Sequence, residues 1–289
     1  MIRLRSGSSE ATLLPRIGGA IGSFSVDGRA ILRPTPEGTT DPLETACFPL
    51  VPYANRIADG RFTFAGRGHA LPCNVHGFAH PLHGLGWLKA WTIEDQAEDR
   101  AVVACSHEAD AHWPWDWSAT QRCVLEDGAL HVLLEVTNRA AAPMPCGLGQ
   151  HPYFVRDPDG RLRFAAAGVW LNDDGMIPAR RAPADHFGNF AQGAVPLAGS
   201  LTDNCWFGWD GTATWQGAAL QSDEARFVHV FAPPEEAFLC IEPTSQMPDA
   251  FNRTDDAGGT VLEPGGSARL GMTIRASGPA RPVGPDGNL

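Results

Sequence analysis

Turn signals at short intervals constrain the fold of this chain most. Asp-Gly pairs begin at Asp27, Asp59, Asp127, Asp159 and Asp210, and the 289 residues include 32 glycines and 24 prolines. An Asp-Gly pair suits the tight turn of a β-hairpin, because both residues tolerate the positive φ that such turns require. Between these turns the apolar runs are short and helical periodicity is hard to find. The sequence therefore predicts an all-β protein.

Several segments carry clear strand signals. Residues 121–125 and 130–136 flank the Asp127-Gly128 turn and read as a hairpin. Further strands are expected over residues 61–64, 225–231, 237–241 and 269–274. Many short strands are typical of a sandwich or a barrel, and the strand pattern alone favours neither.

Composition narrows the domain organisation and the partners. A chain of this length with 43% hydrophobic residues can form one large β domain, and no shift in composition marks a boundary. We expect a single domain over residues 1–289, with 277–289 as a loose C-terminal tail. The net charge of −11 and the lack of a Lys/Arg cluster argue against nucleic acid and anionic membranes as partners.

The seven cysteines and the apolar pattern suggest a location. The cysteine count is odd and no Cys-x-x-Cys pair occurs, so neither a zinc finger nor a disulfide framework is expected. No apolar run is long enough for a signal peptide or a membrane span. These features predict a cytoplasmic protein with reduced thiols.

Two distant segments hold the strongest candidates for chemistry. His151 lies in Gly-Leu-Gly-Gln-His-Pro-Tyr-Phe, and Glu242 follows the apolar run 238–241, at the expected end of a buried strand. A histidine and a glutamate that face each other form a general acid/base pair. A buried carboxylate needs a partner or a function, so a structural arginine partner for Glu242 is the alternative.

Asn55 and Arg56 end a Pro-rich apolar segment over residues 48–57. The guanidinium offers several donors in a fixed fork, which suits recognition of hydroxyl groups and ring oxygens. A capping role, or a pair with a structural carboxylate, is equally compatible with the spacing. Asp203, before an amide and aromatic run, is a candidate acceptor for substrate hydroxyls or the start of an Asx turn.

Three histidines, His76, His80 and His83, share a Gly-rich loop that leads to Trp87. The loop is compatible with a metal site, although its spacing matches no zinc motif and holds no acidic residue. It is also compatible with a substrate contact on which Trp87 stacks, or with solvated histidines. The alternating Trp113, Trp115 and Trp117 form either a carbohydrate platform or, by preference, a stripe of the core.

The order of these motifs resembles the aldose 1-epimerase (mutarotase) family. Asn-Arg-Ile at 55–57 is followed by His-Gly at 83–84, Gly-Gln-His-Pro-Tyr-Phe at 149–154, Asp-Asn-Cys at 203–205 and Ile-Glu-Pro at 241–243. The resemblance extends from about Ala11 to Ile274. It implies a large antiparallel β-sandwich of the galactose mutarotase-like type, an isomerase activity without a cofactor or metal, and a free monosaccharide as the substrate of a monomer or homodimer.

The resemblance also implies roles for residues. His151 corresponds to the general acid and Glu242 to the general base, while His83 corresponds to a second histidine near the ring oxygen. Arg56 and Asp203 correspond to contacts with sugar hydroxyls, and Asn55 matches the motif without an assigned role. Three departures lie close to these positions and bear on sugar specificity: Gln150 before the histidine, Gln246 in place of a histidine, and the extra histidines at 76 and 80.

Other functions remain open from the sequence. One is a non-catalytic carbohydrate-binding protein on the same scaffold, which binds sugar without exchanging anomers. Another is a metal-dependent isomerase or oxygenase that uses His76, His80 and His83. A mutarotase for a sugar phosphate or sugar acid is a third, and a phosphate would require a cationic cluster at the cleft.

Overall fold

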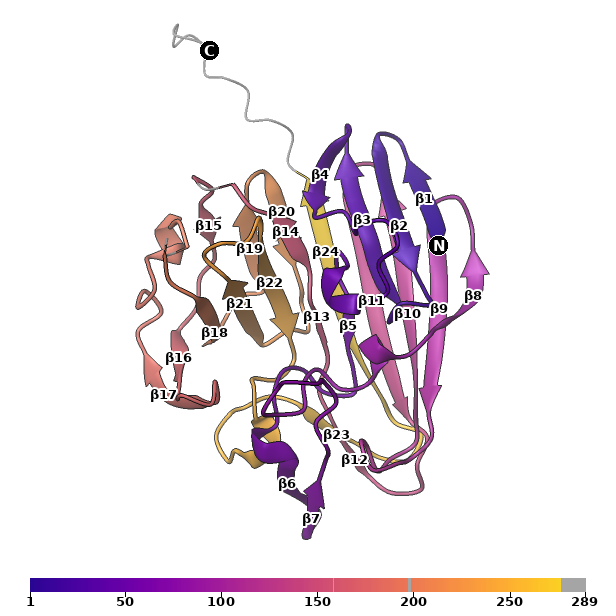
Figure 1. Cartoon of the computed structure of the whole chain (residues 1–289), viewed down its shortest axis with the longest axis vertical. Helices are drawn as coiled ribbons and strands as arrows, with labels where there is room; N and C mark the ends of the chain where they lie inside the picture. The colour runs from indigo at the N-terminus through magenta and orange to yellow at the C-terminus, as the bar shows by residue number, and fades with distance from the viewer. Residues whose placement is uncertain (158, 197–198, 277–289) are drawn as a thin grey trace, which may run out of the picture.

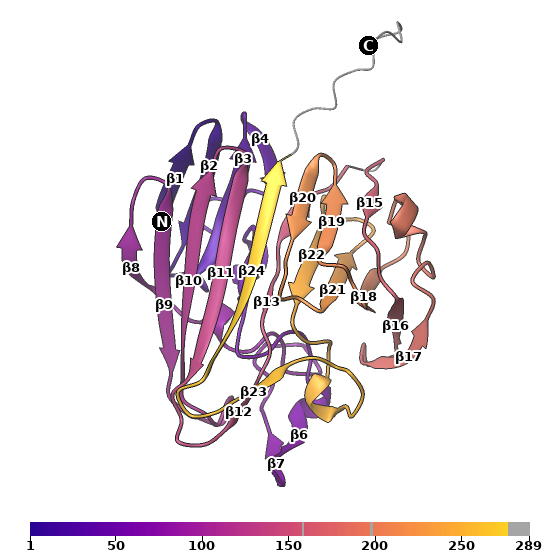
Figure 2. The ribbon, with the colours of Figure 1, turned by 180° about the vertical axis from the view of Figure 1, so that it is seen from behind.

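Two large antiparallel sheets pack against each other in the computed structural model (Figures 1 and 2), which describes residues 1–276 except 158, 197 and 198. The predicted antiparallel β-sandwich is confirmed. The expected tail over 277–289 lies outside the described residues. Among the described residues, no helix has the length and apolar character needed to cross a membrane.

The first sheet carries the candidate site. Its order is β1 (Ile2–Ser6), β2 (Ser9–Leu14), β3 (Ala20–Val26), β4 (Arg29–Leu32), β14 (Tyr153–Val155), β22 (Phe238–Thr244), β21 (Phe227–Ala232), β18 (Thr202–Phe207), β16 (Gly168–Asn172) and β17 (Pro178–Ala182). The short β13 (Gly149–Gln150) pairs with β22 and with β5 (Pro49–Leu50).

The second sheet covers the inner face of the first. Its order is β15 (Leu162–Arg163), β19 (Thr212–Trp215), β20 (Ala218–Gln221), β24 (Ser267–Ala276), β11 (Ala129–Asn138), β10 (Trp117–Glu126), β9 (Arg100–His107) and β8 (Thr92–Gln96). Two small ribbons pair β6 (Arg61–Phe64) with β7 (Arg67–Ala70), and β12 (Met144–Cys146) with β23 (Thr260–Leu262). The short 3₁₀ helices are η1 (Pro42–Glu44), η2 (Ala58–Gly60), η3 (Gly86–Leu88), η4 (Phe190–Gln192) and η5 (Ala250–Asn252).

The β10–β11 hairpin confirms the clearest sequence prediction. Glu126 pairs with Ala129 across a turn in which Asp127 has φ 51° and Gly128 has φ 79°. Positive φ at both central residues gives the turn the twist of its flanking strands. The strands expected over 61–64, 237–241 and 269–274 also form, and the one expected over 225–231 begins at Phe227.

Apolar side chains from both sheets meet in one core. In β10 every second side chain is buried and packs against apolar residues of the first sheet, as the period of two requires. Trp113, Trp115 and Trp117 all belong to this core, and Trp113 lies 6.0 Å from Phe62, ring centre to ring centre. The preferred interpretation of these tryptophans as a core stripe is therefore correct.

One polar chain crosses the core between the sheets. The Gln121 amide of β10 donates to the Gly19 carbonyl at 2.7 Å and accepts from the Gln150 amide at 3.0 Å. Gln150 in turn accepts from the Cys47 thiol at 3.3 Å. Both glutamines are fully buried, so this chain satisfies groups that would otherwise be costly.

We predict that Gln121→Leu lowers the free energy of unfolding by about 1–3 kcal/mol, because it leaves buried partners without hydrogen bonds. The double variant Gln121→Leu/Gln150→Leu should be less destabilised than the sum of the two single variants. Urea denaturation of the four proteins measures the coupling. Strict additivity would show that the two glutamines do not support each other.

Candidate active site

Strand register brings polar and aromatic side chains from four strands to one face of the first sheet. Glu242 lies opposite His229, and Phe231, the next residue on that face of β21, lies opposite Asp203. Tyr153 lies on the same face, because it is opposite Cys240, which is itself opposite Phe231. Directly opposed residues of antiparallel strands share a face, so these side chains project together, away from the core. Glu242 lies inside β22, which continues to Thr244, and not at the strand end that the sequence suggested.

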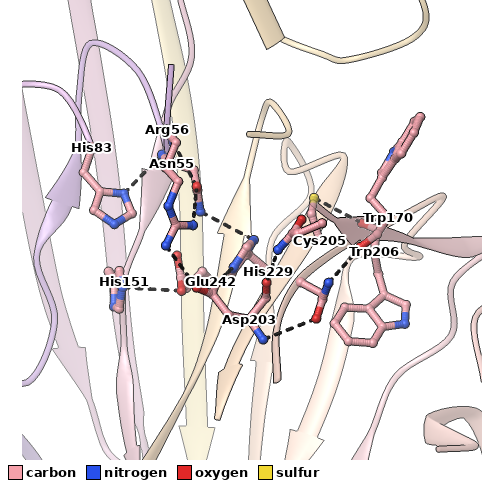
Figure 3. A network of polar contacts seen from close by, with 12 residues as sticks. Asn55, Arg56, His83, His151, Trp170, Asp203, Cys205, Trp206, His229 and Glu242 are labelled. Carbon is pink, nitrogen blue, oxygen red and sulfur yellow. Dashed lines mark hydrogen bonds and ion pairs between the residues drawn. The ribbon is translucent and has the colours of Figure 1, made fainter. Parts of the chain in front are cut away.

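All six residues predicted for the site line one cavity of about 270 Å³. The cavity lies over the outer face of β14, β22, β21 and β18 and is closed at one side by the loops around residues 55 and 83. Figure 3 shows the polar side chains converging. The lining residues are Leu43, Asn55, Arg56, Phe78, Leu82, His83, His151, Tyr153, Asp203, His229, Phe231, Phe238 and Glu242.

His151 is held in a stack of rings. Its imidazole lies between Phe48, at 4.6 Å, and Tyr153, at 4.7 Å, with both rings nearly parallel to it. Phe48 stacks in turn on Trp87, and the Arg33 guanidinium lies 3.6 Å from the centre of the Tyr153 ring. Trp87 therefore supports the stack from behind and does not line the cavity, which excludes the substrate platform considered for it.

His151 and Glu242 approach each other across the cavity. The distance from His151 Nε2 to Glu242 Oε1 is 3.4 Å, and both side chains are almost completely buried. Burial lowers the pKa of His151 to about 3. Burial, with the nearby Asp203 charge, raises the pKa of Glu242 well above its ordinary value. The pair therefore favours its neutral form, with one proton between the two groups.

Arg56 forms an ion pair with Asp203, at 3.0 Å from Nη2 to Oδ2. Asp203 also accepts a 2.6 Å hydrogen bond from His229 Nε2. Burial alone would raise the pKa of Asp203, but His229 and Arg56 outweigh it and lower that pKa to about 2. The alternative partner for Glu242, a structural arginine, is thus wrong: the cavity arginine pairs with Asp203, and Asp203 lies in a strand instead of an Asx turn.

Two residues in left-handed conformation shape the loop side of the cavity. Asn55 and His83 both have φ 60°, and the Asn55 N–H donates to His83 Nδ1 at 3.1 Å. A neutral His83 consequently carries its proton on Nε2. Burial lowers the pKa of His83 well below its ordinary value, which keeps the ring neutral. The next residue, Gly84, has φ 68° and must be a glycine, because a Cβ there would lie 2.3 Å from the Val51 carbonyl oxygen.

The segment Pro248-Asp249-Ala250, which follows β22, has a structural role. Asp249 accepts from the Ala58 N–H at 2.9 Å, and its own N–H donates to the Arg56 carbonyl at 2.7 Å. These two hydrogen bonds hold the chain on both sides of Ile57. The segment therefore fixes the loop that presents Asn55 and Arg56 to the cavity.

The residues that depart from the family pattern do not line the cavity. Gln150 belongs to the polar chain in the core, and Gln246 donates to the Ala54 carbonyl behind the site. Their bearing on sugar specificity stays a prediction. His76 and His80 are also outside the cavity lining, and no three His, Cys, Asp or Glu side chains of the described residues cluster to hold a metal.

His229 lines the cavity but was not predicted from the sequence. It lies in the apolar strand segment Phe-Val-His-Val-Phe, where a histidine is 2% exposed and flanked by core residues. The period of two was the available signal: Val228 and Val230 face the core, so His229 must face away from it. The apolar wall residues Leu43, Phe78 and Phe231 were missed as well, because nothing in their local sequence separates them from core residues.

Comparison with known proteins identifies the family. The family model described as aldose 1-epimerase matches residues 1–275, so the chain belongs to the aldose 1-epimerase family. The Escherichia coli protein YphB, of uncharacterised function, is 32% identical over 275 residues, which is 89% of this chain and 92% of that protein.

Solved structures agree with the family and the fold. An Escherichia coli protein considered a candidate aldose 1-epimerase is 31% identical and superposes with a TM-score of 0.87 over 95% of this chain and 97% of that one. A galactose mutarotase-like protein from Clostridium acetobutylicum, at 18% identity, superposes with a TM-score of 0.82 over 95% of this chain and 94% of that one. The fold is therefore galactose mutarotase-like.

We predict that Gly84→Ala lowers the free energy of unfolding by about 2–4 kcal/mol, since it combines a left-handed backbone with a clash against Val51. Gly66→Ala is the matched control: Gly66 has φ 75°, but no atom lies within 4 Å of its built Cβ. The control should lose only about 1–2 kcal/mol. Equal losses in urea denaturation would show that the backbone conformation, and not the clash, demands glycine at residue 84.

Proposed function

We propose that this protein is an aldose 1-epimerase that interconverts the α and β anomers of a free aldose. The observation that carries the proposal is the 3.4 Å approach of His151 and Glu242 inside a cavity that also holds polar contacts for hydroxyl groups. A volume of about 270 Å³ lies just below the roughly 300–1,000 Å³ of sites for drug-sized ligands, which suits a single sugar ring.

The chemistry follows from the acid/base pair. Glu242, as a carboxylate, takes the proton of the anomeric hydroxyl while His151, as an imidazolium, protonates the ring oxygen. The C1–O5 bond breaks and the open-chain aldehyde forms. After rotation about C1–C2, neutral His151 takes the proton back from the C5 hydroxyl, and Glu242 returns its own to the carbonyl oxygen as the ring closes.

Both half-reactions use the same total number of protons. The pair opens the ring as Glu⁻/HisH⁺ and closes it as GluH/His, two forms that differ only in where one proton resides. The burial that favours the neutral form therefore also prepares the pair for ring closure. Arg56 and Asp203 hold sugar hydroxyls, and His83 offers its Nε2–H near the ring oxygen.

The charges of the cavity favour a neutral sugar over a sugar phosphate. Among the described lining residues, Arg56 is the one permanent cation, and Asp203 neutralises it. A phosphate would lack an unpaired cationic partner in this site. The arginine pair Arg180-Arg181 lies on the edge strand β17 and not at the cavity.

We predict that Glu242→Gln and His151→Asn each lower kcat by at least about 10²–10⁴-fold, because each removes a proton donor and acceptor. Anomer exchange of fresh α-D-glucose, α-D-galactose and L-arabinose, followed by polarimetry, measures the effect. Thermal denaturation verifies that the variants fold. A wild-type rate in either variant would remove that residue from the mechanism, and sugar binding without exchange in the wild type would indicate a carbohydrate-binding protein.

We also predict a broad plateau in the pH profile of kcat/KM. Activity needs one proton on the pair, so it falls at low pH only when His151 is protonated beside a protonated Glu242. Because the pKa of His151 is lowered to about 3, this acidic limb should lie well below the ordinary histidine range. The basic limb should lie above the ordinary carboxyl range, where Glu242 loses the shared proton. An acidic limb near pH 6.5 would contradict a buried neutral His151.

A further inference from the structure

Four side chains at the base of the cavity form a closed ring of hydrogen bonds. His229 Nε2 contacts Asp203 Oδ1 at 2.6 Å, and Arg56 Nη2 contacts Asp203 Oδ2 at 3.0 Å. Arg56 returns to Asn55 through Nη1 and its backbone N–H, both of which donate to Asn55 Oδ1, at 3.3 and 2.8 Å. The Asn55 amide nitrogen closes the ring at 3.5 Å from His229 Nδ1.

The donors around Asn55 fix the orientation of its amide. Its oxygen must face the two N–H groups of Arg56, because the reversed amide would place an NH₂ group against both donors. The Asn55 NH₂ therefore points at His229 Nδ1. Two donors cannot share one hydrogen bond, so Nδ1 must be unprotonated and act as the acceptor.

We infer that Asn55 fixes His229 as a neutral ring with its proton on Nε2, and that this ring positions the Asp203 carboxylate to receive a sugar hydroxyl. The role in sugar binding rests on the proposed function, whereas the tautomer follows from the hydrogen bonds alone. Asn55, for which the sequence offered no role, thus acts through His229 and Arg56.

The charges around His229 act in opposite directions. Asp203 attracts a proton to the ring, but Arg56 already neutralises that carboxylate, and the Asn55 NH₂ occupies the only position where a second ring proton could bond. The groups that face His229 from the neighbouring elements are Asp203 and Cys205 of β18, Glu242 of β22, Asn55 and Arg56 of the loop, and the imidazoles of His83 and His151.

A neutral His229 has a consequence for the two carboxylates of the site. It donates to Asp203 but, with Nδ1 engaged by Asn55, it offers no proton to its cross-strand neighbour Glu242. Asp203 is stabilised as an anion by its ion pair with Arg56 and by the hydrogen bond from His229. The raised pKa of Glu242 lets this residue keep the proton that it exchanges with His151. The neutral His229 imidazole therefore gives the two carboxylates different roles. Asp203 stays ionised and binds the sugar, whereas Glu242 exchanges a proton during the reaction.

The tautomer can be tested by NMR of the full-length protein with ¹⁵N-labelled histidine at pH 7. The His229 signals are identified by their loss in His229→Gln. We expect a protonated Nε2 and an unprotonated Nδ1 in the wild type. In Asn55→Asp the donor becomes an acceptor, so both ring nitrogens should be protonated. A proton on Nδ1 in the wild type, or a ring that stays neutral in Asn55→Asp, would overturn the inference.

The positioning role has a separate kinetic test. His229→Leu removes the donor to Asp203, whereas the amide of His229→Gln can still supply an N–H at that point. We expect His229→Leu to raise KM by about tenfold to a hundredfold, the equivalent of one hydrogen bond to a charged group, with a smaller change in kcat. His229→Gln should recover most of the loss. Unchanged KM in a folded His229→Leu variant would refute the positioning role.

The two tests separate the inference from the proposed function. If no aldose is turned over, the NMR result still decides the tautomer. If aldoses are turned over but Nδ1 is protonated in the wild type, the inference fails while the epimerase proposal stands.

Discussion

The site depends on burying one acid and one base in direct contact. His151 and Glu242 lie 3.4 Å apart with almost no exposure to solvent. Ionising only one of the two groups therefore carries a large desolvation cost. Among the described residues, His151 Nδ1 and Glu242 Oε2 have no hydrogen-bond partner, which is an unfavourable arrangement for stability. The stack of Phe48, His151 and Tyr153 and the central strand β22 hold the pair despite this cost.

Much of the fold and the principal site residues could be predicted from the sequence. The Asp127-Gly128 turn and the alternation around it specify a hairpin through local chemistry alone, and the structure forms it. The convergence of Asn55, His83 and His151 was predicted only through resemblance to a family, because no local pattern places residues so distant in sequence around one cavity. The family itself is now established by a match over residues 1–275.

What the sequence could not provide is the pairing between strands. Glu242 was expected at a strand end with arginine as its alternative partner, but the register of β22 with β21 places it opposite His229. Arg56, which belongs to a loop, forms its ion pair with Asp203 of β18 instead. Gln150 shows that neighbours in sequence can lie on opposite faces of a strand. It adjoins His151, yet the alternation of an extended chain directs its side chain into the core, toward Gln121.

Alternation also explains how a stable sandwich supports a polar cavity. Val230 and Ile241 pack into the core, while their neighbours His229 and Glu242 project from the opposite face of the same strands. The core residues thus fix the spacing of His229 and Glu242 without lining the cavity. If the proposed function holds, changes on the cavity wall, at Phe78 or Phe231 for example, alter the accepted sugar without disturbing the acid/base pair, because the strands that hold the pair are stabilised from the other side.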